Sequence, residues 1–316
     1  MDVDWQTLSL VGLVLGLLAV ATTVGQFLKR QSDIGLNPAV VQTFNSRIRA
    51  WWLMCTVLAS AFLLGSASTV ATIVLFGLIS FWALREFITL TPTRLGDHRT
   101  LFWVFFVFTP LQYVLVGMNR YELYSVLIPV YAFLFIPARV ALAGDYKRFL
   151  ERTAKIQAGL MVCVYCLSHA PALLTLPKLD ENARVRLLFF FVLIVQLNDV
   201  LQYAWGKWLG KHVIAPAISP NKTWEGFLGG VGSATLVGAA LWWTIPFREP
   251  WHAAGMALAM SVMGFAGGMT MSAIKRDRGV KDYGTLVVGH GGVLDRIDSI
   301  CFAAPIFFHL SLYYFG

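Results

Sequence analysis

Apolar runs, most of them near the length that spans a bilayer, alternate with short polar connections along the whole chain. A transmembrane helix needs about 20 mainly apolar residues. The pattern therefore predicts an all-α integral membrane protein, a polytopic bundle of about ten transmembrane helices with a lower bound of about eight. The expected spans are Leu8–Phe27, Ala50–Leu64, Ser68–Leu84, Leu101–Met118, Leu123–Ala143, Ile156–Leu176, Leu187–Trp205, Phe227–Phe247, Trp251–Ile274 and Leu294–Phe315.

The composition supports this fold class. Of the 316 residues, 57% are hydrophobic and only 13% are charged, which gives more apolar surface than a soluble core can hide. We expect a single membrane domain over residues 1–316, with a polar loop after the first span that carries a short interfacial helix over Pro38–Arg49. Cys163 and Cys166 lie inside an expected span without a second pair, which favours apolar packing over metal binding.

The basic residues gather on alternate connections. With the N-terminus outside, most of the 25 Lys and Arg residues fall on connections that face inward, as the positive-inside rule requires. This bias predicts both termini on the outer side of a cell membrane and a cytoplasmic face that suits anionic lipid head groups. The net charge of +8 is then largely topogenic and gives no reason to expect nucleic acid. The acidic start, Met1–Asp4, favours an uncleaved anchor over a signal peptide.

An ionisable residue interrupts the seventh expected span. Asn198 and Asp199 follow the apolar run Phe189–Leu197. A charge at that depth costs about 3 kcal/mol on insertion scales, so we expect Asp199 to face the bundle interior or a wet cavity. The alternative is a structural carboxylate that pairs with a buried Lys or Tyr.

The connection after this span carries a candidate anion site. It reads Gly206-Lys-Trp-Leu-Gly210-Lys and then Ser219-Pro-Asn-Lys222-Thr223-Trp-Glu225-Gly226, where the eighth span must begin. Backbone N–H groups and the helix dipole at such a start bind anions, and Lys222 adds a charge. The alternative is that Ser219 or Thr223 only caps the helix while Lys222 reaches to the membrane surface.

The stretch from Ser272 to Ser299 holds the densest polar chemistry of the chain. Its cations and its Gly-rich turn suit the oxygens of a phosphate. The cations are Lys275, Arg276, Arg278 and Lys281, and the turn is Gly289-His290-Gly291-Gly292. His290 either donates to a phosphate, which we favour, or locks the turn through a backbone hydrogen bond.

Asp295 and Asp298 follow, three residues apart at the start of the last span. In a helix, both carboxylates project from one face. They are either helix caps or ligands of Mg²⁺, which takes one or two carboxylates and fills its shell with phosphate and water. Beside so many cations we favour Mg²⁺, with Asp199 as a further candidate ligand. Arg296 projects from another face, towards phosphate or a neighbouring carboxylate.

These two segments resemble the signature of the phosphatidate cytidylyltransferase (CDP-diacylglycerol synthase) family. The first matches at Asp199, Tyr203, Gly206, Gly210, Ser219, Pro220, Lys222, Thr223, Glu225 and Gly226, and the second at the basic run, the Gly-His-Gly-Gly turn and Asp295-Arg296-Ile-Asp298. The resemblance covers roughly Val195–Ala303, so we expect residues 191–316 to form the catalytic half and residues 1–190 to form family-variable helices. The sequence departs from the family at Gln202, Val287 and Val288, and at Gly268, where many bacterial members carry an acidic metal ligand.

The resemblance implies transfer of a cytidylyl group from CTP to phosphatidate, which yields CDP-diacylglycerol and pyrophosphate in phospholipid biosynthesis. It also implies Mg²⁺, with room for a second cation, and a homodimer. The implied roles divide into three sets. Lys275, Arg276, Lys281 and Arg296 neutralise the triphosphate; Ser219, Lys222, Thr223, His290, Gly291 and Gly292 contact phosphate; Asp282 and Glu225 pair with these cations.

Two other functions are compatible with the sequence. A CTP-dependent polyprenol or lipid kinase would transfer the γ-phosphate and release a nucleoside diphosphate. A non-catalytic lipid-binding or transport descendant of the synthase would bind phosphatidate without consuming CTP, and the departures at Gly268 and Val288 favour it. The retention of nearly every ionisable motif residue favours the enzyme.

Overall fold

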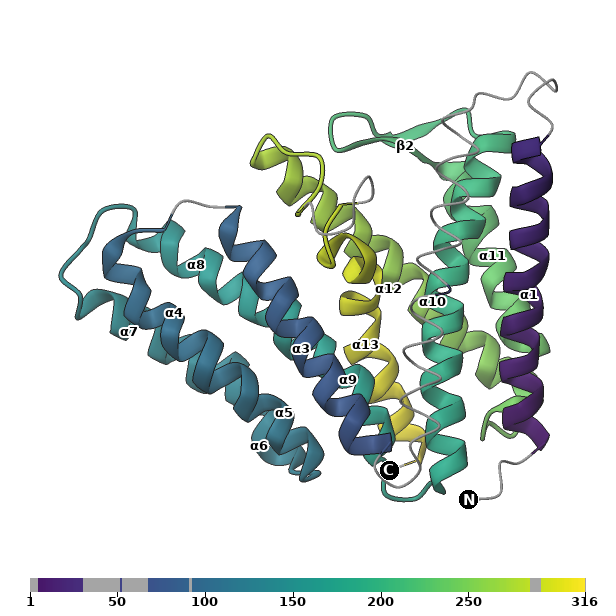
Figure 1. Ribbon diagram of the computed structural model, residues 1–316, viewed down its shortest axis with the longest axis horizontal. Helices are drawn as coiled ribbons and strands as arrows, with labels where there is room; N and C mark the ends of the chain where they lie inside the picture. Colours follow the sequence, from purple (N-terminus) through teal and green to yellow (C-terminus); the bar gives the residue numbers. More distant parts are fainter. Residues whose placement is uncertain (1–4, 31–51, 53–67, 91–92, 285–290, 316) are drawn as a thin grey trace. The chain divides into compact units, whose positions relative to one another are not determined.

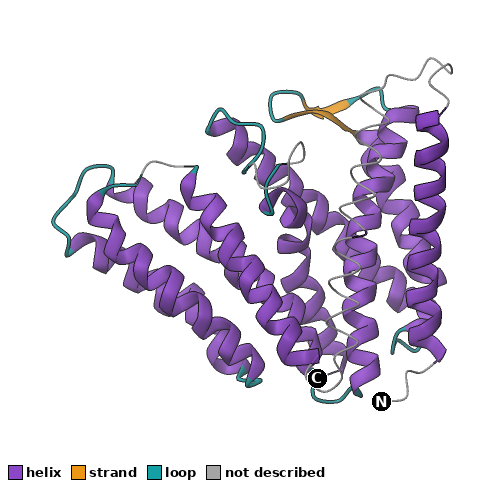
Figure 2. Ribbon diagram, viewed as in Figure 1, coloured by secondary structure: helices purple, strands orange, loops and turns teal. Residues whose placement is uncertain are grey.

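The computed structural model describes residues 5–30, 52, 68–90, 93–284 and 291–315, and it divides into two compact units, Met1–Thr72 and Ile73–Gly316 (Figures 1 and 2). The first unit contains α1 (Trp5–Arg30). The indole Nε1 of Trp52 donates a hydrogen bond of 3.0 Å to the hydroxyl of Thr22 on this helix. The unit boundary falls within α3 (Ser68–Thr89).

The second unit is built almost entirely from helices. After α3 they are η3 (Leu95–Asp97), α4 (His98–Trp103), η4 (Val104–Phe108), α5 (Thr109–Gly117), α6 (Tyr121–Val126), η5 (Leu127–Ala132), α7 (Phe133–Ala141), α8 (Phe149–Leu160), η6 (Met161–Cys166), α9 (Leu167–Ala172), η7 (Leu173–Thr175), α10 (Glu181–Leu209), α11 (Trp224–Ala240), η8 (Trp242–Thr244), α12 (Pro250–Asp277) and α13 (Leu294–Phe315). Two short strands, β1 (Val213–Ala215) and β2 (Ser219–Thr223), lie between α10 and α11.

The described residues contain seven helical segments long and apolar enough to cross a membrane. They are Thr69–Thr89, Leu95–Gly117, Tyr121–Ala141, Phe149–Thr175, Glu181–Leu209, Pro250–Asp277 and Leu294–Phe315. Each overlaps an expected span, so the prediction of an all-α polytopic membrane protein is confirmed. The first and eighth expected spans fall on α1 and on α11 with η8. All of the second expected span except Trp52, and the interfacial helix expected over Pro38–Arg49, lie outside the described residues.

The helices extend beyond the apolar runs that predicted them. α10 begins at Glu181, six residues before the expected span, because Asp180 caps it by accepting from the backbone N–H of Ala183 at 3.2 Å. α3 continues to Thr89, five residues past the expected end at Leu84. Backbone hydrogen bonding continues a helix into the polar boundary of the membrane, where hydropathy alone no longer marks it.

Small residues allow α10, α11 and α12 to approach one another closely. A Cβ built on Gly238 of α11 would lie 2.4 Å from the Cβ of Ala257 on α12. A Cβ on Gly230 of α11 would lie 2.3 Å from the Cγ of Gln202 on α10. Glycine at such positions lets membrane helices gain close van der Waals contact. The result is a tight group of helices beyond whose ends the hairpin of β1 and β2 extends (Figure 1).

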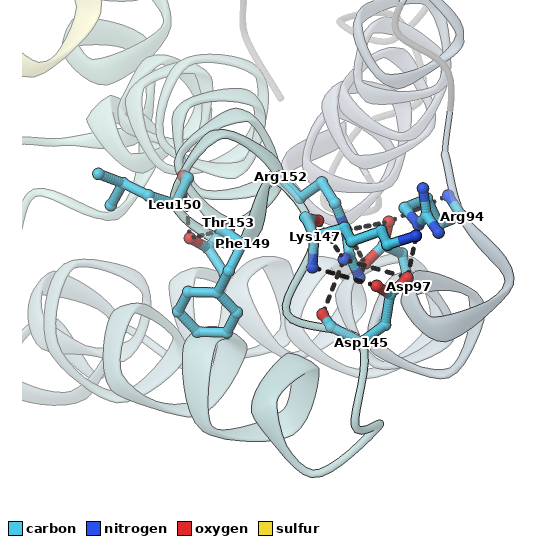
Figure 3. A network of polar contacts seen from close by, with 8 residues as sticks. All are labelled: Arg94, Asp97, Asp145, Lys147, Phe149, Leu150, Arg152 and Thr153. Carbon is cyan, nitrogen blue, oxygen red and sulfur yellow. Dashed lines mark hydrogen bonds and ion pairs between the residues drawn. The ribbon is translucent and has the colours of Figure 1, made fainter.

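A buried arginine ties three segments together at one end of the bundle (Figure 3). Arg152 of α8 is only 6% exposed, and its Nε donates to both carboxylate oxygens of Asp97 at 3.0 Å. Its Nη1 donates to the backbone carbonyls of Asp145 and Lys147, both at 2.9 Å. Arg94 donates to the Asp145 carboxylate and thereby holds the pKa of that group below its ordinary value. The start of α4, the α7–α8 connection and α8 are therefore fixed to one another.

Replacing Asp97 with Asn should destabilise the protein, because the buried Arg152 guanidinium loses the charge of its nearest carboxylate and keeps the more distant Asp145 at 3.3 Å. Breaking a buried ion pair costs about 3–5 kcal/mol, which corresponds to a fall of roughly 6 °C or more in the unfolding midpoint. Tryptophan fluorescence of the detergent-purified protein during heating measures this. Arg148→Gln is the matched control, because its ion pair with Glu151 is long, at 3.9 Å, and exposed. Equal midpoints for the two variants would contradict a stabilising role of the Asp97–Arg152 pair.

Candidate active site

The carboxylate of Asp295 joins the end of α12, the following loop and the start of α13. Its Oδ1 accepts a hydrogen bond from Lys275 Nζ at 2.7 Å. Its Oδ2 accepts from the backbone N–H groups of Tyr283 at 2.7 Å and Gly292 at 2.9 Å. The side chain is only 8% exposed. A carboxylate with three such partners is held in one orientation, and its charge is compensated by an ammonium group.

Asp298 lies one helical turn further along α13, as the spacing predicted. Its Oδ1 accepts from the backbone N–H of Ser299 at 2.8 Å. Its Oδ2 faces α12, because a Cβ built on Gly268 would lie 3.8 Å from that oxygen. The two acids of the last motif thus both border the polar end of α12.

Lys222 brings the first motif to these acids. Its Nζ would lie 2.7 Å from a Cβ built on Gly268, and it lies 4.9 Å from the centre of the Phe265 ring. Burial lowers the pKa of Lys222, while the negative charges of Asp199 and Asp298 act in the opposite direction. The ammonium therefore occupies the space beside Gly268 and interacts with carboxylates of both motifs.

Thr223, Gly210 and Gly226 form the joint between α10 and α11. The Thr223 hydroxyl caps α11 by accepting from the backbone N–H of Gly226 at 3.2 Å. A Cβ on Gly210 would lie 2.7 Å from that hydroxyl oxygen, and one on Gly226 would lie 2.8 Å from the backbone carbonyl of Gln202. The spacing of these glycines is explained by close packing of backbone on backbone.

The segment before α11 is a β-hairpin, which the sequence analysis did not predict. β1 and β2 pair antiparallel, with Val213 opposite Thr223 and Ala215 opposite Ser219. Glu225 fixes the base of the hairpin by accepting from the backbone N–H groups of Lys211 and His212 at 3.1 and 3.2 Å, and it also pairs with the His212 ring. Its contacts are therefore with the hairpin and not with the phosphate-facing cations that the sequence suggested.

The other cations lie at the rim. Arg276 is exposed and donates to the backbone carbonyls of Ile218 in the hairpin and Val280 after α12, both at 3.2 Å. Lys281 and Asp282 are exposed in the loop that follows. Arg296 is half-buried, and its backbone carbonyl accepts from Gln196 of α10 at 3.2 Å. Arg276 thus joins the hairpin to the loop, so both motifs share one rim.

The Gly-rich turn is described only in part, since Gly289 and His290 lie outside the described residues. Gly291 has a φ of +81°, which side chains disfavour, and a Cβ there would lie 2.7 Å from Asp295 Oδ2. The turn therefore closes on the Asp295 carboxylate. Glycine at 291 is required by this contact as well as by the backbone angle.

The carboxylates of Asp295 and Asp298 suit a hard divalent cation, but other ligands must complete its coordination shell. Among the described residues, no group of three or more His, Cys, Asp or Glu side chains is arranged to hold a metal ion. Asp295 and Asp298 offer oxygen donors beside Lys275 and Lys222. Mg²⁺ needs only one or two carboxylates when phosphates and water complete its shell. The donor set fits Mg²⁺ that arrives with a polyphosphate.

Glu86 is a site residue that the sequence analysis missed. It lies near the end of α3, is only 5% exposed, and accepts from the backbone N–H groups of Val293 and Leu294 at 3.0 and 2.9 Å. The third expected span ended before it, so it was counted as a residue of the connection. An acidic residue followed by Phe87-Ile88 was the signal available, because a carboxylate flanked by apolar residues needs a buried partner.

Comparison with known proteins gives consistent matches. The model of the cytidylyltransferase family matches residues 45–314. A protein of Escherichia coli (strain K12) described as uncharacterized protein YnbB is 36% identical over 306 residues, which cover 95% of this chain and 96% of that protein. The phosphatidate cytidylyltransferase of Staphylococcus aureus (strain COL) is 42% identical over 120 residues, 38% of this chain and 46% of that enzyme.

A second relative of that name comes from Mycobacterium leprae (strain TN). It is 35% identical over 169 residues, which cover 54% of this chain and 53% of that enzyme. The chain thus aligns with about half the length of these two named enzymes. The family match begins far ahead of the two motifs and includes α3 with Glu86. Because that match covers most of the chain and both motifs meet at one site, the chain belongs to the cytidylyltransferase family.

Proposed function

We propose that this membrane protein is a phosphatidate cytidylyltransferase, which converts CTP and phosphatidate into CDP-diacylglycerol and pyrophosphate. The observation that carries the proposal is the pairing of two acids with two lysines from both motifs. Asp295 is bonded to Lys275, and Asp298 faces the space that holds the Lys222 ammonium. The printed names of the bacterial relatives support the same reaction.

Cytidylyl transfer between two anions requires compensation of their negative charge more than it requires a reactive side chain. A phosphate oxygen of phosphatidate attacks the α-phosphorus of CTP and forms a new P–O bond. The bond from the α-phosphorus to the bridging oxygen of the β-phosphate breaks, and its electrons leave with pyrophosphate. Both reactants are anions, so alignment and neutralisation lower the barrier, and no protein nucleophile is needed.

Each side chain has a defined task in this proposal. Asp295 and Asp298 would hold Mg²⁺, with Asp199 acting on the same centre through Lys222. When bound, Mg²⁺ would supply charge stabilisation on the phosphate oxygens. Lys275 and Lys222 lie at these acids and would neutralise the charge of the phosphate. Among the residues that the structure describes, the Thr223 hydroxyl accepts from Gly226 and donates no hydrogen bond, so its hydrogen could be donated to phosphate.

The remaining basic residues add positive charge around the same site. Arg276, Lys281 and Arg296, together with His290, contact the triphosphate, and Ser219 and the Gly291-Gly292 turn contact a phosphate of nucleotide or lipid. A lipid substrate enters sideways, with its acyl chains still in the bilayer. The positive-inside bias puts this site on the cytoplasmic side and both termini outside. We expect the enzyme to act as a homodimer.

Replacing Asp295 or Asp298 with Asn should lower cytidylyl transfer at least about 100-fold, because a metal-binding carboxylate is removed while the side-chain shape is kept. The assay uses α-labelled CTP, Mg²⁺ and phosphatidate in nanodiscs, and it measures labelled lipid and released pyrophosphate. Asp277→Asn is the matched control, since Asp277 is an exposed carboxylate at the end of α12. Wild-type turnover in folded Asp295→Asn and Asp298→Asn would exclude the metal assignment, and release of a nucleoside diphosphate would favour a kinase.

Replacing Gly268 with Ala should displace the Lys222 ammonium, because the new methyl group takes its place. The loss of one charge-assisted contact, about 1.5–3 kcal/mol, corresponds to a roughly 10- to 100-fold fall in kcat/KM. Lys222→Met should give a similar loss, and the double variant should be no worse than Lys222→Met alone. Gly255→Ala is the matched control on the same helix, where a Cβ meets open space. Multiplying losses would show that Gly268 acts independently of Lys222.

A further inference from the structure

We propose that Glu86 is a positioning residue for the transfer reaction, and that its carboxylate fixes the first turn of α13 from the neighbouring helix α3. The hydrogen bonds between Glu86 and this turn are observed in the structure. Only the effect of the turn on cytidylyl transfer rests on the proposed function. Both Glu86 oxygens are used: Oε1 accepts from the backbone N–H of Val293 at 3.0 Å, and Oε2 accepts from that of Leu294 at 2.9 Å.

The local sequence explains why this cap has to come from another helix. The first backbone N–H groups of a helix have no partner inside it, and a Ser, Thr, Asp or Asn before the helix normally accepts from them. Ahead of α13 the chain has Gly291-Gly292-Val293, which offers no side-chain oxygen. A buried carboxylate at this end is also favoured by the helix dipole. Glu86 therefore caps the N-terminus of α13, because the residues that directly precede this helix have no side chain that can do so.

Two glycines of the polar stretch owe their size to this carboxylate. A Cβ on Gly292 would lie 2.3 Å from Glu86 Oε2, and a Cβ on Gly284 would lie 2.8 Å from Oε1. Any other residue at position 292 would push the carboxylate away from the helix. Gly292, which the sequence analysis attributed to phosphate contact, thus also makes room for Glu86.

The next residue of α3, Phe87, contacts the loop that precedes α13. The Phe87 ring stacks on the Tyr283 ring, with centroids 6.3 Å apart and planes at 17°. The backbone N–H of Tyr283 donates to Asp295 Oδ2, and its hydroxyl donates to the backbone carbonyl of Met271 at 2.9 Å. Two successive residues of α3 therefore support the loop and the helix start that orient Asp295.

This arrangement also determines which groups at the site can bind phosphate. The amides of Val293 and Leu294 are bonded to Glu86, so the positive end of α13 is already neutralised by a carboxylate. The amides of Val293 and Leu294 are therefore not available to bind phosphate, which falls to the side chains and the turn named in the proposed function. A change at Glu86 should act on the placement of Asp295 and Asp298 and leave lipid binding largely intact.

The test is Glu86→Gln, which keeps the size of the side chain but replaces one acceptor with an NH₂ group that faces a backbone N–H. We expect kcat to fall at least about tenfold, since a misplacement of about 1 Å can cost about 100-fold. The Mg²⁺ concentration for half-maximal rate should rise, while KM for phosphatidate should stay within about twofold. Glu122→Gln is the matched control, because Glu122 is an exposed acid in the first turn of α6.

Hydrogen–deuterium exchange of the peptide 291–300 supplies a readout that needs no catalysis. Exchange at Val293 and Leu294 should be slow in the wild type and in Glu122→Gln, and it should accelerate in Glu86→Gln. If the wild type makes no CDP-diacylglycerol, the proposed function fails, but this exchange pattern still decides whether Glu86 caps α13.

A double variant guards against loss of folding in Glu86→Gln. Gly292→Ala should reduce kcat and raise the Mg²⁺ requirement by displacing the carboxylate, and Glu86→Ala with Gly292→Ala should be no worse than Gly292→Ala alone. Wild-type kcat and Mg²⁺ dependence in folded Glu86→Gln would overturn the proposal. So would a lower yield of Glu86→Gln with unchanged kinetics and exchange, or losses that multiply in the double variant.

Discussion

The site depends on one buried carboxylate, Asp295, which links the end of α12 to the start of α13. Its bonds to Lys275, to the Tyr283 amide and to the Gly292 amide close the loop between two long membrane helices. A buried charge is tolerated only with such partners. Because these bonds fix the start of α13, Asp298 on the same helix is held in place beside Lys222 of the hairpin.

Burial and charge are balanced by pairs in which each acid faces a lysine. The Lys222 ammonium fills the space beside Gly268, where a Cβ would lie 2.7 Å from its Nζ and 3.8 Å from Asp298 Oδ2. Lys275 is bonded to Asp295 at 2.7 Å. Each of the two acids therefore has a lysine beside it.

Much of this architecture follows from sequence, because hydropathy marks helices that must satisfy their backbone inside a bilayer. The placement of Asp295 and Asp298 on α13 followed from their spacing. The hairpin of β1 and β2 did not, since β2 consists of four polar residues and a proline, which favour a turn by local chemistry. Glu86 was also missed, because α3 runs past its apolar segment and the partner of the carboxylate is a helix start 207 and 208 positions further on.

The most direct measurement of the central claim is the stereochemistry at the α-phosphorus. The enzyme is supplied with one P-chiral stereoisomer of α-thio-CTP, Mg²⁺ and phosphatidate, and the configuration of the thio-CDP-diacylglycerol is read by ³¹P NMR. A single in-line attack by the lipid phosphate, with charge neutralisation but no protein nucleophile, predicts inversion. Retention of configuration, or a lipid product without the nucleotide, would contradict the account.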